Sequence, residues 1–360
     1  MQTIAKLTDK ALILLHNLIE TPSFSGEEEN TSLLIEAWFT HHQIPFKREN
    51  NNIWAVNKYF DESKPTLLLN SHQDTVFPNK GYTNDPFQTI EKEGKIYGLG
   101  SNDAGGCLVS LLAAFTYYYD NKDLTYNLIM AATAEEENSG KKGLNSILQH
   151  LPKLDCAIVG EPTLMNLAIA ERGLLVLDIS VKGTASHAAH NNPDNAIYNS
   201  LKVIEWFKTH TFDKISETLG AVKMTVTQIN AGQQHNLVPD ECKLVVDIRV
   251  NDRYTNEEIY AMIRKSVSSD KVTITPRSLH LKSSSIPKEH PLVLAGIELG
   301  RTTYGSPTIS DQAVLYCQSL KMGPGDSLRS HTADEFIYKQ EVIDAIPLYI
   351  ELLKKTILKS

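Results

Sequence analysis

Residues 67–76 read Leu-Leu-Leu-Asn-Ser-His-Gln-Asp-Thr-Val, an apolar run that ends in a histidine and an aspartate two positions apart. A short apolar run of this kind predicts a buried strand. Side chains two positions apart on an extended chain point the same way, so His72 and Asp74 would face one direction. Ligands commonly bind at the carboxyl ends of strands in α/β sheets. A lone histidine near a turn is often without function, so this pair by itself leaves the matter open.

The composition excludes several classes of protein. Apolar residues make up 41% and charged residues 22% of the 360-residue chain, which is ordinary for a globular protein. The net charge of −8, without a basic cluster, argues against nucleic acid as a partner. No apolar run approaches the roughly 18 residues that span a bilayer, and charges interrupt residues 1–20 too early for a signal peptide. We therefore expect a cytoplasmic protein with no membrane partner.

Strand-like and helix-like patterns alternate through the first half of the chain. The strand-like runs are 53–56, 66–69, 128–132 and 156–159, and the helix-like segments are 8–21, 106–119 and 140–149. This alternation predicts an α/β sheet domain. Ser25 followed by Glu28 has the form of a capping box that opens another helix.

Around residue 172 the pattern changes to strand, helix, strand, strand, helix, strand. These segments are 174–181, 193–209, 222–229, 244–250, 255–266 and 272–275. The order predicts a small sheet with helices on one face. Helical patterns return after residue 277 and end in an amphipathic helix at 341–358. We expect a catalytic domain of residues 1–171 and 278–360, interrupted by an α+β domain of residues 172–277.

More acids and one more histidine follow predicted strands or glycine-rich turns. They are Asp103 in the turn 98–106, Glu135, Glu136 and Glu137 after one apolar strand, Glu161 after another, and His331 after the turn 323–325. Taken singly, Asp103 could be a helix N-cap and the three acids a solvated turn. A dication would relieve the repulsion among crowded acids. Carboxylates mixed with imidazoles suit Zn²⁺, Co²⁺ or Mn²⁺.

In this order, the motifs resemble those of the M20 metallopeptidase superfamily, in particular the acetylornithine deacetylase and succinyl-diaminopimelate desuccinylase group. The resemblance covers nearly the whole chain, and residues 95–105 are most similar to the acetylornithine deacetylase branch. It implies a zinc-exopeptidase-like catalytic domain, with a central mixed β-sheet flanked by helices, and an inserted ferredoxin-like dimerisation domain. It also implies a homodimer and two divalent metal ions, with zinc favoured and cobalt or manganese as alternatives.

The resemblance implies a role for each chemically active side chain. Five would hold the metals: His72 and Glu161 one ion, Glu137 and His331 the other, with Asp103 bridging both. Asp74 would orient His72. Glu136, directly before a metal-binding glutamate, would be the general acid/base.

In the inserted domain, the resemblance assigns three more residues. His187 would stabilise the tetrahedral intermediate in the partner subunit's active site, and Asn236 and Arg249 would hold the substrate's α-carboxylate. From the residues alone, Arg249 ends an alternating strand, and a guanidinium is well shaped to bind a carboxylate through two hydrogen bonds. A surface ion pair is the simpler alternative for Arg249.

Two segments depart from the pattern of the relatives. Residues 103–106 read Asp-Ala-Gly-Gly where relatives usually have Asp-Met-Lys-Gly, so a charge is missing and glycine is expected to loosen the turn. Residues 306–311 stand where relatives often have a glycine-rich segment. Neither change removes a catalytic group, but both bear on substrate preference.

The sequence therefore predicts a metal-dependent hydrolase of N-acyl α-amino acids. We favour N2-acetyl-ornithine, or another N-acyl-ornithine, as the substrate, with ornithine as the product in arginine biosynthesis. One alternative is a desuccinylase acting on succinyl-ornithine or succinyl-diaminopimelate, which would need an extra cationic contact. A distant alternative is a non-catalytic binding homologue, against which the presence of Glu136 argues.

Overall fold

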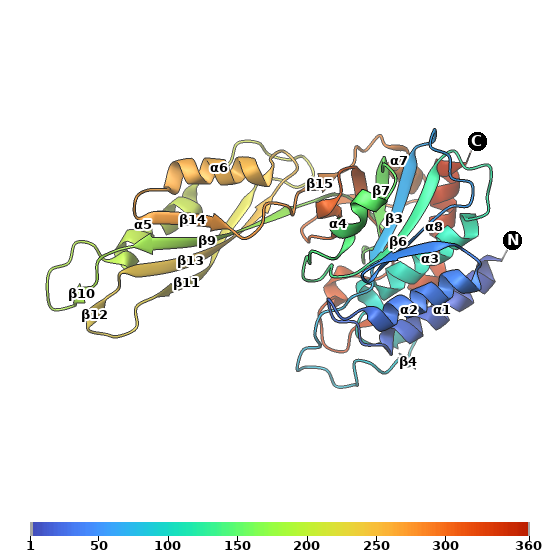
Figure 1. Ribbon diagram of the computed structural model, residues 1–360, viewed down its shortest axis with the longest axis horizontal. Helices are drawn as coiled ribbons and strands as arrows, with labels where there is room; N and C mark the ends of the chain where they lie inside the picture. The colour runs from blue at the N-terminus through green and yellow to red at the C-terminus, as the bar shows by residue number, and fades with distance from the viewer. Residues whose placement is uncertain (1–2, 359–360) are drawn as a thin grey trace. The chain divides into compact units, whose positions relative to one another are not determined.

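The computed structural model describes residues 3–358, and these residues form two compact units (Figure 1). Unit 2 comprises Ala170–Ser284 and Gly305–Ile309, and unit 1 comprises the other described residues. The sequence pattern assigns residues 170–171, 278–284 and 305–309 to the catalytic domain, whereas they lie in unit 2. The reason is local hydrogen bonding, because the carbonyl of Leu281 accepts from Leu174 N and that of Ser306 accepts from Arg172 N.

A mixed β-sheet forms the centre of unit 1, with strand order β1-β2-β6-β3-β7-β17-β8 and with β15 and β16 beside β8. The strands are β1 Phe46–Glu49, β2 Asn52–Val56, β3 Thr66–His72, β6 Asn127–Thr133, β7 Cys156–Val159, β8 Leu167–Glu171, β15 Ser284–Ser285, β16 Thr303–Ser306 and β17 Gln318–Lys321. The four central strands β6, β3, β7 and β17 are parallel, and β2 and β8 run antiparallel to them. Every residue of β3 and β6 is buried, as expected for parallel strands covered on both faces.

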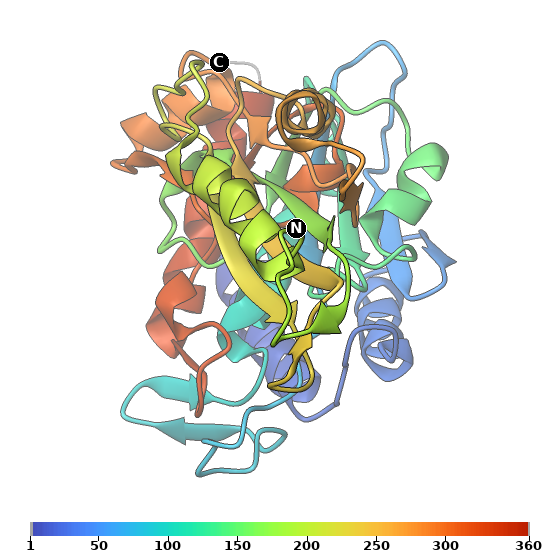
Figure 2. The same cartoon turned by 90° about the vertical axis from the view of Figure 1, so that its left-hand side faces the viewer.

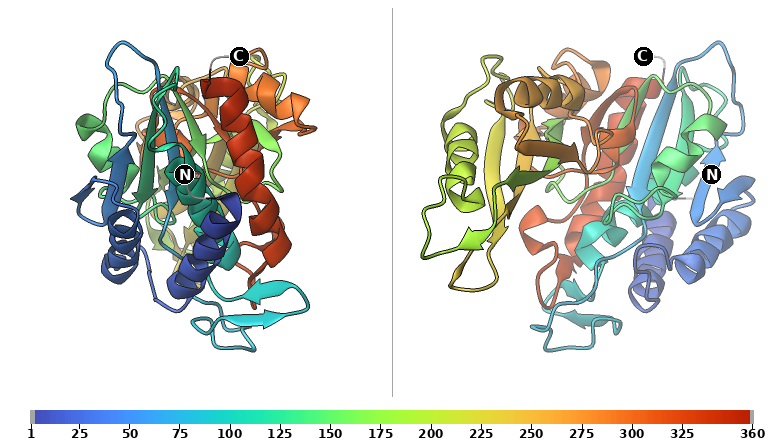
Figure 3. Two further views of the ribbon diagram at one scale, coloured as in Figure 1. Left: turned by 90° about the vertical axis from the view of Figure 1, so that its right-hand side faces the viewer. Right: turned by 60° about the vertical axis from the view of Figure 1, so that its left-hand side comes forward.

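Helices cover both faces of this sheet, which confirms the predicted α/β class. One face shares a large apolar core with α1 Ile4–Ile19, α2 Glu29–His41, α3 Gly106–Tyr118, α7 Pro291–Glu298 and α8 Lys339–Ile357 (Figure 3). The other face forms a smaller core with α4 Leu144–Ile147 and the short helices η2 Leu148–His150 and η3 Asp311–Val314. Helix α3 is buried over nearly its whole length, which explains why its sequence is apolar on all sides.

A small antiparallel sheet brings together two segments that are far apart in the sequence. Its strands are β4 Ile90–Lys92, β5 Lys95–Tyr97 and β18 Phe336–Tyr338, in the order β18-β5-β4. The π-helical turn η1 Ser101–Gly105 follows β5, and the short helix η4 Ser327–Arg329 precedes β18. The pairing of β18 with β5 therefore places the loop of His331 beside the turn that carries Asp103.

Unit 2 contains a four-stranded antiparallel sheet with helices on one face (Figure 2, with α5 in front of the strands). The elements are β9 Gly173–Lys182, β10 Ser186–His187, α5 Ala196–Thr209, β11 Lys223–Ala231, β12 Leu237–Val238, β13 Glu241–Val250, α6 Asn256–Val267 and β14 Val272–Pro276. The strand order is β11-β13-β9-β14, and β10 pairs separately with β12. The sequence β9-α5-β11-β13-α6-β14 is the ferredoxin-like arrangement. Burial alternates along β9 and β13 because one face of the sheet packs against both helices.

Two local expectations from the sequence are wrong. Helix α2 begins at Glu29 without a side-chain cap, so Ser25 and Glu28 form no capping box. Ser25 Oγ instead donates to the Asp74 carboxylate at 2.7 Å, and the Glu28 carboxylate accepts from Glu135 N. Glycine also does not loosen the turn after Asp103, because a Cβ at Gly105 would lie 2.5 Å from the carbonyl oxygen of Gly100. Here glycine permits close packing.

None of the helices in residues 3–358 combines the length and the apolarity needed to cross a membrane.

Candidate metal centre

Acidic and imidazole side chains converge at the carboxyl ends of β3, β6 and β7. His72 is the last residue of β3, the acids 135–137 follow β6, and Glu161 comes two residues after β7. These three strands are parallel neighbours, so their ends meet at one edge of the sheet. Two loops complete the group with Asp103 and His331. The predicted metal ligands therefore come from five separate segments of unit 1.

The Asp103 carboxylate lies between two imidazoles. Its Oδ1 is 3.3 Å from His72 Nε2, and its Oδ2 is 3.7 Å from His331 Nε2. His331 Nε2 also lies 3.0 Å from Glu137 Oε2, while His72 Nε2 lies 3.8 Å from Glu161 Oε1. The five side chains thus form two groups that share Asp103.

Four of the five side chains are largely buried, and His331 is half exposed. The exposed fractions of the side chains are 1% for His72, 8% for Glu137, 11% for Asp103 and 13% for Glu161, but 53% for His331. A substrate would therefore approach beside His331.

Asp74 ties the histidine of β3 to the acids that follow β6. His72 Nδ1 lies 2.9 Å from the carbonyl oxygen of Asp74 and 3.5 Å from its Oδ1. The Asp74 carboxylate accepts from the backbone N of both Glu136 and Glu137 at 3.1 Å. Burial opposes its ionisation, but the contacts with His72 and Ser25 outweigh burial and lower the pKa of Asp74. Asp74 therefore contacts Nδ1 of the His72 ring, and the other ring nitrogen, Nε2, faces Asp103.

Glu136 and Glu135 have different surroundings. A carboxylate oxygen of Glu136 lies within 4.8 Å of ligand atoms of His72 and Glu161. Burial, together with the negative charges of nearby carboxylates, raises the pKa of Glu136 well above its usual value. The Glu135 carboxylate accepts instead from Lys142 N at 2.9 Å and joins neither group. Glu136 thus lies among the converging side chains, whereas Glu135 binds within its own loop.

The sequence pattern did not indicate a role for Glu335, and the structure places it behind Asp103. Its carboxylate is buried and accepts from the backbone N of Gly100, Asn102 and Asp103 at 3.2, 2.9 and 3.0 Å. Burial and the nearby Asp103 charge raise the pKa of Glu335 to about 8. Only the tertiary contact reveals this role, because these backbone donors lie more than 230 positions away.

A second buried acid, Asp311, was treated in the sequence only as part of a departure from the relatives. Its carboxylate accepts from Thr133 Oγ1 at 2.7 Å, at the end of β6. Burial raises the pKa of Asp311 to about 6. Asp311 thereby supports the end of the strand from which Glu136 and Glu137 emerge.

The loop that carries the exposed His331 is held at both ends. The Arg329 guanidinium forms two hydrogen bonds with the Glu341 carboxylate and lies over the rings of Phe336 and Tyr338, 5.0 and 4.9 Å from their centroids. At the other end, the Asp334 carboxylate accepts from Thr83 N and Thr83 Oγ1. His331 itself has a φ of 59°, in the left-handed region that non-glycine residues rarely adopt. These anchors hold the imidazole in place although it is half exposed.

The three predicted site residues of unit 2 lie at opposite ends of β13, with His187 and Asn236 near its start and Arg249 near its end. His187 and Asn236 lie together, because β10 pairs with β12 and Ala188 N donates to the carbonyl of Asn236. Arg249 lies at the other end of β13, eight residues after Glu241, which is about 26 Å along an extended strand. Its guanidinium donates two hydrogen bonds to the Asp247 carboxylate, so a substrate carboxylate would have to compete with Asp247.

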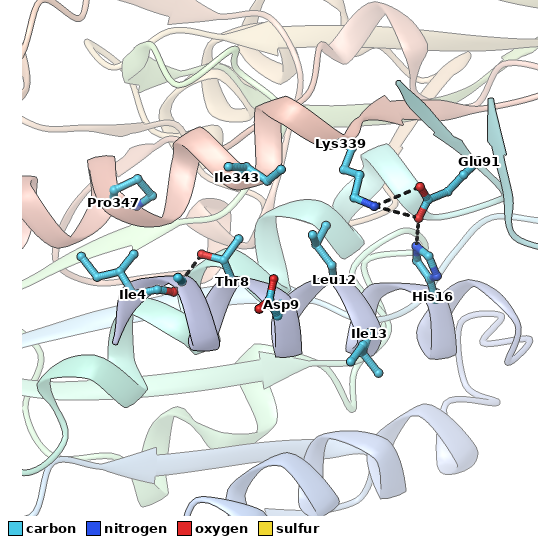
Figure 4. Close-up of a pocket in the computed structure, with 11 residues that line it drawn as sticks. Ile4, Thr8, Asp9, Leu12, Ile13, His16, Glu91, Lys339, Ile343 and Pro347 are labelled. Atoms are coloured by element: carbon cyan, nitrogen blue, oxygen red, sulfur yellow. Dashed lines mark hydrogen bonds and ion pairs between the residues drawn. The ribbon is translucent and has the colours of Figure 1, made fainter. Parts of the chain in front are cut away.

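A separate groove of about 650 Å³ lies between α1 and α8 (Figure 4). Apolar side chains such as Leu12 and Ile343 line it, and at one end Glu91 pairs with His16 and Lys339. Within residues 3–358, groups of three or more converging metal-ligand side chains occur only around His72, and not in this groove.

The converging side chains fit divalent metal ions. Three carboxylates and two imidazoles are the donor types that zinc and similar ions bind in proteins. Burial and the neighbouring acids raise the pKa of Glu161 to about 8 and also raise that of Glu137. Such crowding is costly without a compensating positive charge, and a dication provides one.

Comparison with known proteins gives a consistent result. The family model described as Peptidase family M20/M25/M40 matches residues 68–359. The chain is 27% identical to an acetylornithine deacetylase of Proteus mirabilis, over 90% of this chain and 91% of that protein. It is 26% identical to a succinyl-diaminopimelate desuccinylase of Rickettsia bellii, over 69% of this chain and 67% of that protein. Among solved structures, the Bacillus subtilis YXEP protein, titled a dinuclear metal binding peptidase, has a TM-score of 0.73 at 15% identity and covers 97% of this chain and 98% of its own.

Chelation of divalent metals should make the stability fall as the pH rises. In the metal-free protein the pKa of Glu161 is about 8 against 4.5 ordinarily, and Glu137 raises that of His331 to about 9 against 6.5. The folded state therefore holds more protons than the unfolded state between about pH 4.5 and pH 9, most of all between about pH 6.5 and pH 8, so the free energy of unfolding decreases with pH over this range. Thermal melts of the chelated protein should show a falling midpoint over this range, restored most by divalent metal at the upper end. Glu161→Gln should make the midpoint fall less steeply with pH. A midpoint that rises with pH would contradict the raised pKa values of Glu161 and His331.

Proposed function

The chain belongs to peptidase family M20/M25/M40, and on this basis we propose that it hydrolyses the amide bond of an N-acyl α-amino acid. It is a hydrolase, as that family membership establishes. The observation that carries the finer proposal is the convergence of two imidazoles and three carboxylates on one edge of the sheet, with Glu136 beside them. An amide needs both an activated water and a protonated leaving nitrogen, and such a centre supplies both.

The proposed cofactors are two divalent metal ions, with zinc favoured and cobalt or manganese as alternatives. His72 and Glu161 would hold one ion, Glu137 and His331 the other, and Asp103 both. The support is that the two oxygens of Asp103 face different histidines. When bound, the ions would supply Lewis acidity toward the attacking water and the scissile carbonyl.

Glu136 is the proposed general acid/base. A carboxyl group with a raised pKa can accept a proton from the attacking water and then donate it to the departing nitrogen. Asp74 would act as a positioning residue, because its carboxylate contacts the His72 ring and accepts a hydrogen bond from the backbone N of Glu136. Glu335 would position Asp103 in the same way.

Residues of the inserted domain are proposed to complete the site. His187 would donate a hydrogen bond to the oxyanion of the tetrahedral intermediate, and Asn236 and Arg249 would bind the substrate's α-carboxylate. Within one subunit, β13 separates Arg249 from His187 and Asn236 by about 26 Å. One small substrate cannot span that length, so we infer that the site combines Arg249 of one subunit with His187 and Asn236 of another.

A homodimer through unit 2 would meet this requirement. Strand β11 is an edge strand, bonded only to β13 among the described strands. On the adjoining helix α5, Tyr198 and Leu201 are 68% and 57% exposed, and Ile229 of β11 is 53% exposed. An unpaired edge beside exposed apolar side chains favours pairing with a second copy.

The proposed substrate is N2-acetyl-ornithine or another N-acyl-ornithine, converted to ornithine in arginine biosynthesis. The Proteus mirabilis relative supports this choice by its name and by its coverage of nearly the whole chain. The alternative, a desuccinylase of succinyl-ornithine or succinyl-diaminopimelate, is supported by a relative of similar identity. Release of acetate against succinate from the two ornithine derivatives decides between them. Tight binding of both compounds without hydrolysis of either would support a non-catalytic homologue instead.

Glu136→Gln should leave the metal content near that of the wild type and lower kcat by a factor of about 10² to 10⁴, because the amide cannot accept the proton. Elemental analysis and steady-state kinetics on the same sample measure both quantities. Glu135→Gln is the matched control and should stay within about threefold of wild type, since Glu135 lies outside the converging groups. His331→Ala should instead lower the metal content. Equal metal loss in the Glu136 and His331 variants would rule out these roles.

His187→Ala should lower kcat without changing the metal content. Mixed with an equal amount of Glu136→Gln subunits, it should recover about a quarter of the wild-type activity, because half of the dimers then carry one intact shared site. Each variant alone should remain nearly inactive. If mixing and re-equilibration restore nothing although the subunits exchange, each subunit has a self-contained site.

A further inference from the structure

Three exposed apolar side chains stand on three different loops that carry proposed metal ligands. Phe77 follows His72 by five residues and is 72% exposed, Leu164 follows Glu161 by three and is 46% exposed, and Leu328 precedes His331 by three and is 83% exposed. Single exposed apolar residues are common, but grouped ones often mark a binding surface.

Backbone contacts place these three loops side by side. Leu164 N donates to the carbonyl of Gly325 at 2.7 Å, and Thr163 forms a bridge with Asp326, so the loop of Leu164 adjoins that of Leu328. On the other side, Asn79 Nδ2 donates to the carbonyl of His331 at 3.3 Å. Leu164, Leu328 and Phe77 therefore stand on three adjoining loops, and the loop of Leu328 and His331 lies between the other two. We call these three residues the apolar arc.

Phe77 is the most strongly supported member of the apolar arc. Its ring stacks on that of Phe24, with centroids 4.1 Å apart, and Phe24 packs edge to face against Phe87 at 5.9 Å. Phe24 directly precedes Ser25, whose hydroxyl holds the Asp74 carboxylate. The phenyl ring is thus supported from below and fastened to the loop of His72, while its outer face remains exposed.

The apolar arc surrounds a strongly acidic centre. Seven carboxyl groups lie together there, those of Asp74, Asp103, Glu136, Glu137, Glu161, Asp311 and Glu335. A substrate group that carries its own carboxylate would be repelled here, whereas an uncharged apolar group would bury surface against the arc.

We propose that the apolar arc, with Phe77 as its principal member, binds the acyl half of the substrate and selects uncharged acyl chains. This inference rests on the proposed function, in which Arg249 and Asn236 of unit 2 hold the amino-acid half. The acyl half is then the part of the substrate that is left for the apolar arc to bind. Phe77 is a specificity-determining residue, and it lies outside the groups that hold metal or move protons.

The test compares N-acetyl-, N-propionyl-, N-butyryl- and N-succinyl-ornithine as substrates. In the wild type, each methylene added to the neutral chains should raise kcat/KM about threefold to fivefold, mainly through KM, because a buried methylene gains that factor in binding. The succinyl compound should be the poorest of the four. In Phe77→Ala the gain per methylene should fall to less than about 1.5-fold, and the change should appear mainly in KM.

Three further variants keep the outcome specific. Tyr59→Ala removes another exposed aromatic side chain, in the loop before β3 at the opposite end of that strand, and should preserve the wild-type gain per methylene. Lys80→Ala removes an exposed cation three residues after Phe77, and it tests whether an ion pair with this lysine favours a succinyl carboxylate. Phe77→Leu should retain part of the gain if apolar contact is the cause.

An unchanged gain per methylene in Phe77→Ala would overturn the inference and leave the proposed function intact. The inference would also be overturned if the wild-type enzyme preferred the succinyl compound and the Lys80→Ala variant did not. A wild type that hydrolyses none of the four compounds would overturn both the inference and the proposed function.

Discussion

Mutual repulsion among carboxylates is the constraint on which the site depends. The ends of β3, β6 and β7 deliver acids to a place that solvent reaches poorly, and burial raises the pKa of Glu136 and Glu161. Such a cluster is stable only when protons, imidazolium groups or cations compensate the charge. The same crowding that costs stability without metal gives the centre affinity for divalent ions.

The surrounding structure holds this strained arrangement in place. Asp74 links the end of β3 to the turn after β6, Glu335 fastens the turn of Asp103 through three backbone donors, and Arg329 anchors the loop of His331. Each of these contacts joins segments that are distant in the sequence, except for the anchor of Arg329 to its neighbours 336–341. The precision of the ligand positions therefore comes from the folded unit as a whole and not from any single loop.

Unit 2 poses a different problem, because its proposed binding residues lie at opposite ends of one sheet. A long β-strand is a rigid spacer, so the separation of Arg249 from His187 and Asn236 cannot close by local motion. Assembly of two subunits is the simple solution. The chemistry of the amide bond would then belong to unit 1, recognition of the amino acid to unit 2, and choice of the acyl group to the loops around the opening.

The sequence by itself determined the class of the fold, the family and the order of the chemically active residues. Apolar strands such as 66–72 and 127–133 are recognisable because burial on both faces requires continuous apolar residues. The prediction for Ser25 and Glu28 was wrong. They have the local pattern of a helix cap, but Ser25 binds the Asp74 carboxylate and Glu28 binds the backbone N of Glu135. The sequence pattern indicated no role for Glu335 or Asp311. Only the tertiary structure decided those roles, because a carboxylate's partners are set by which distant backbone and hydroxyl groups the fold brings within hydrogen-bonding distance, and no local pattern encodes that distance.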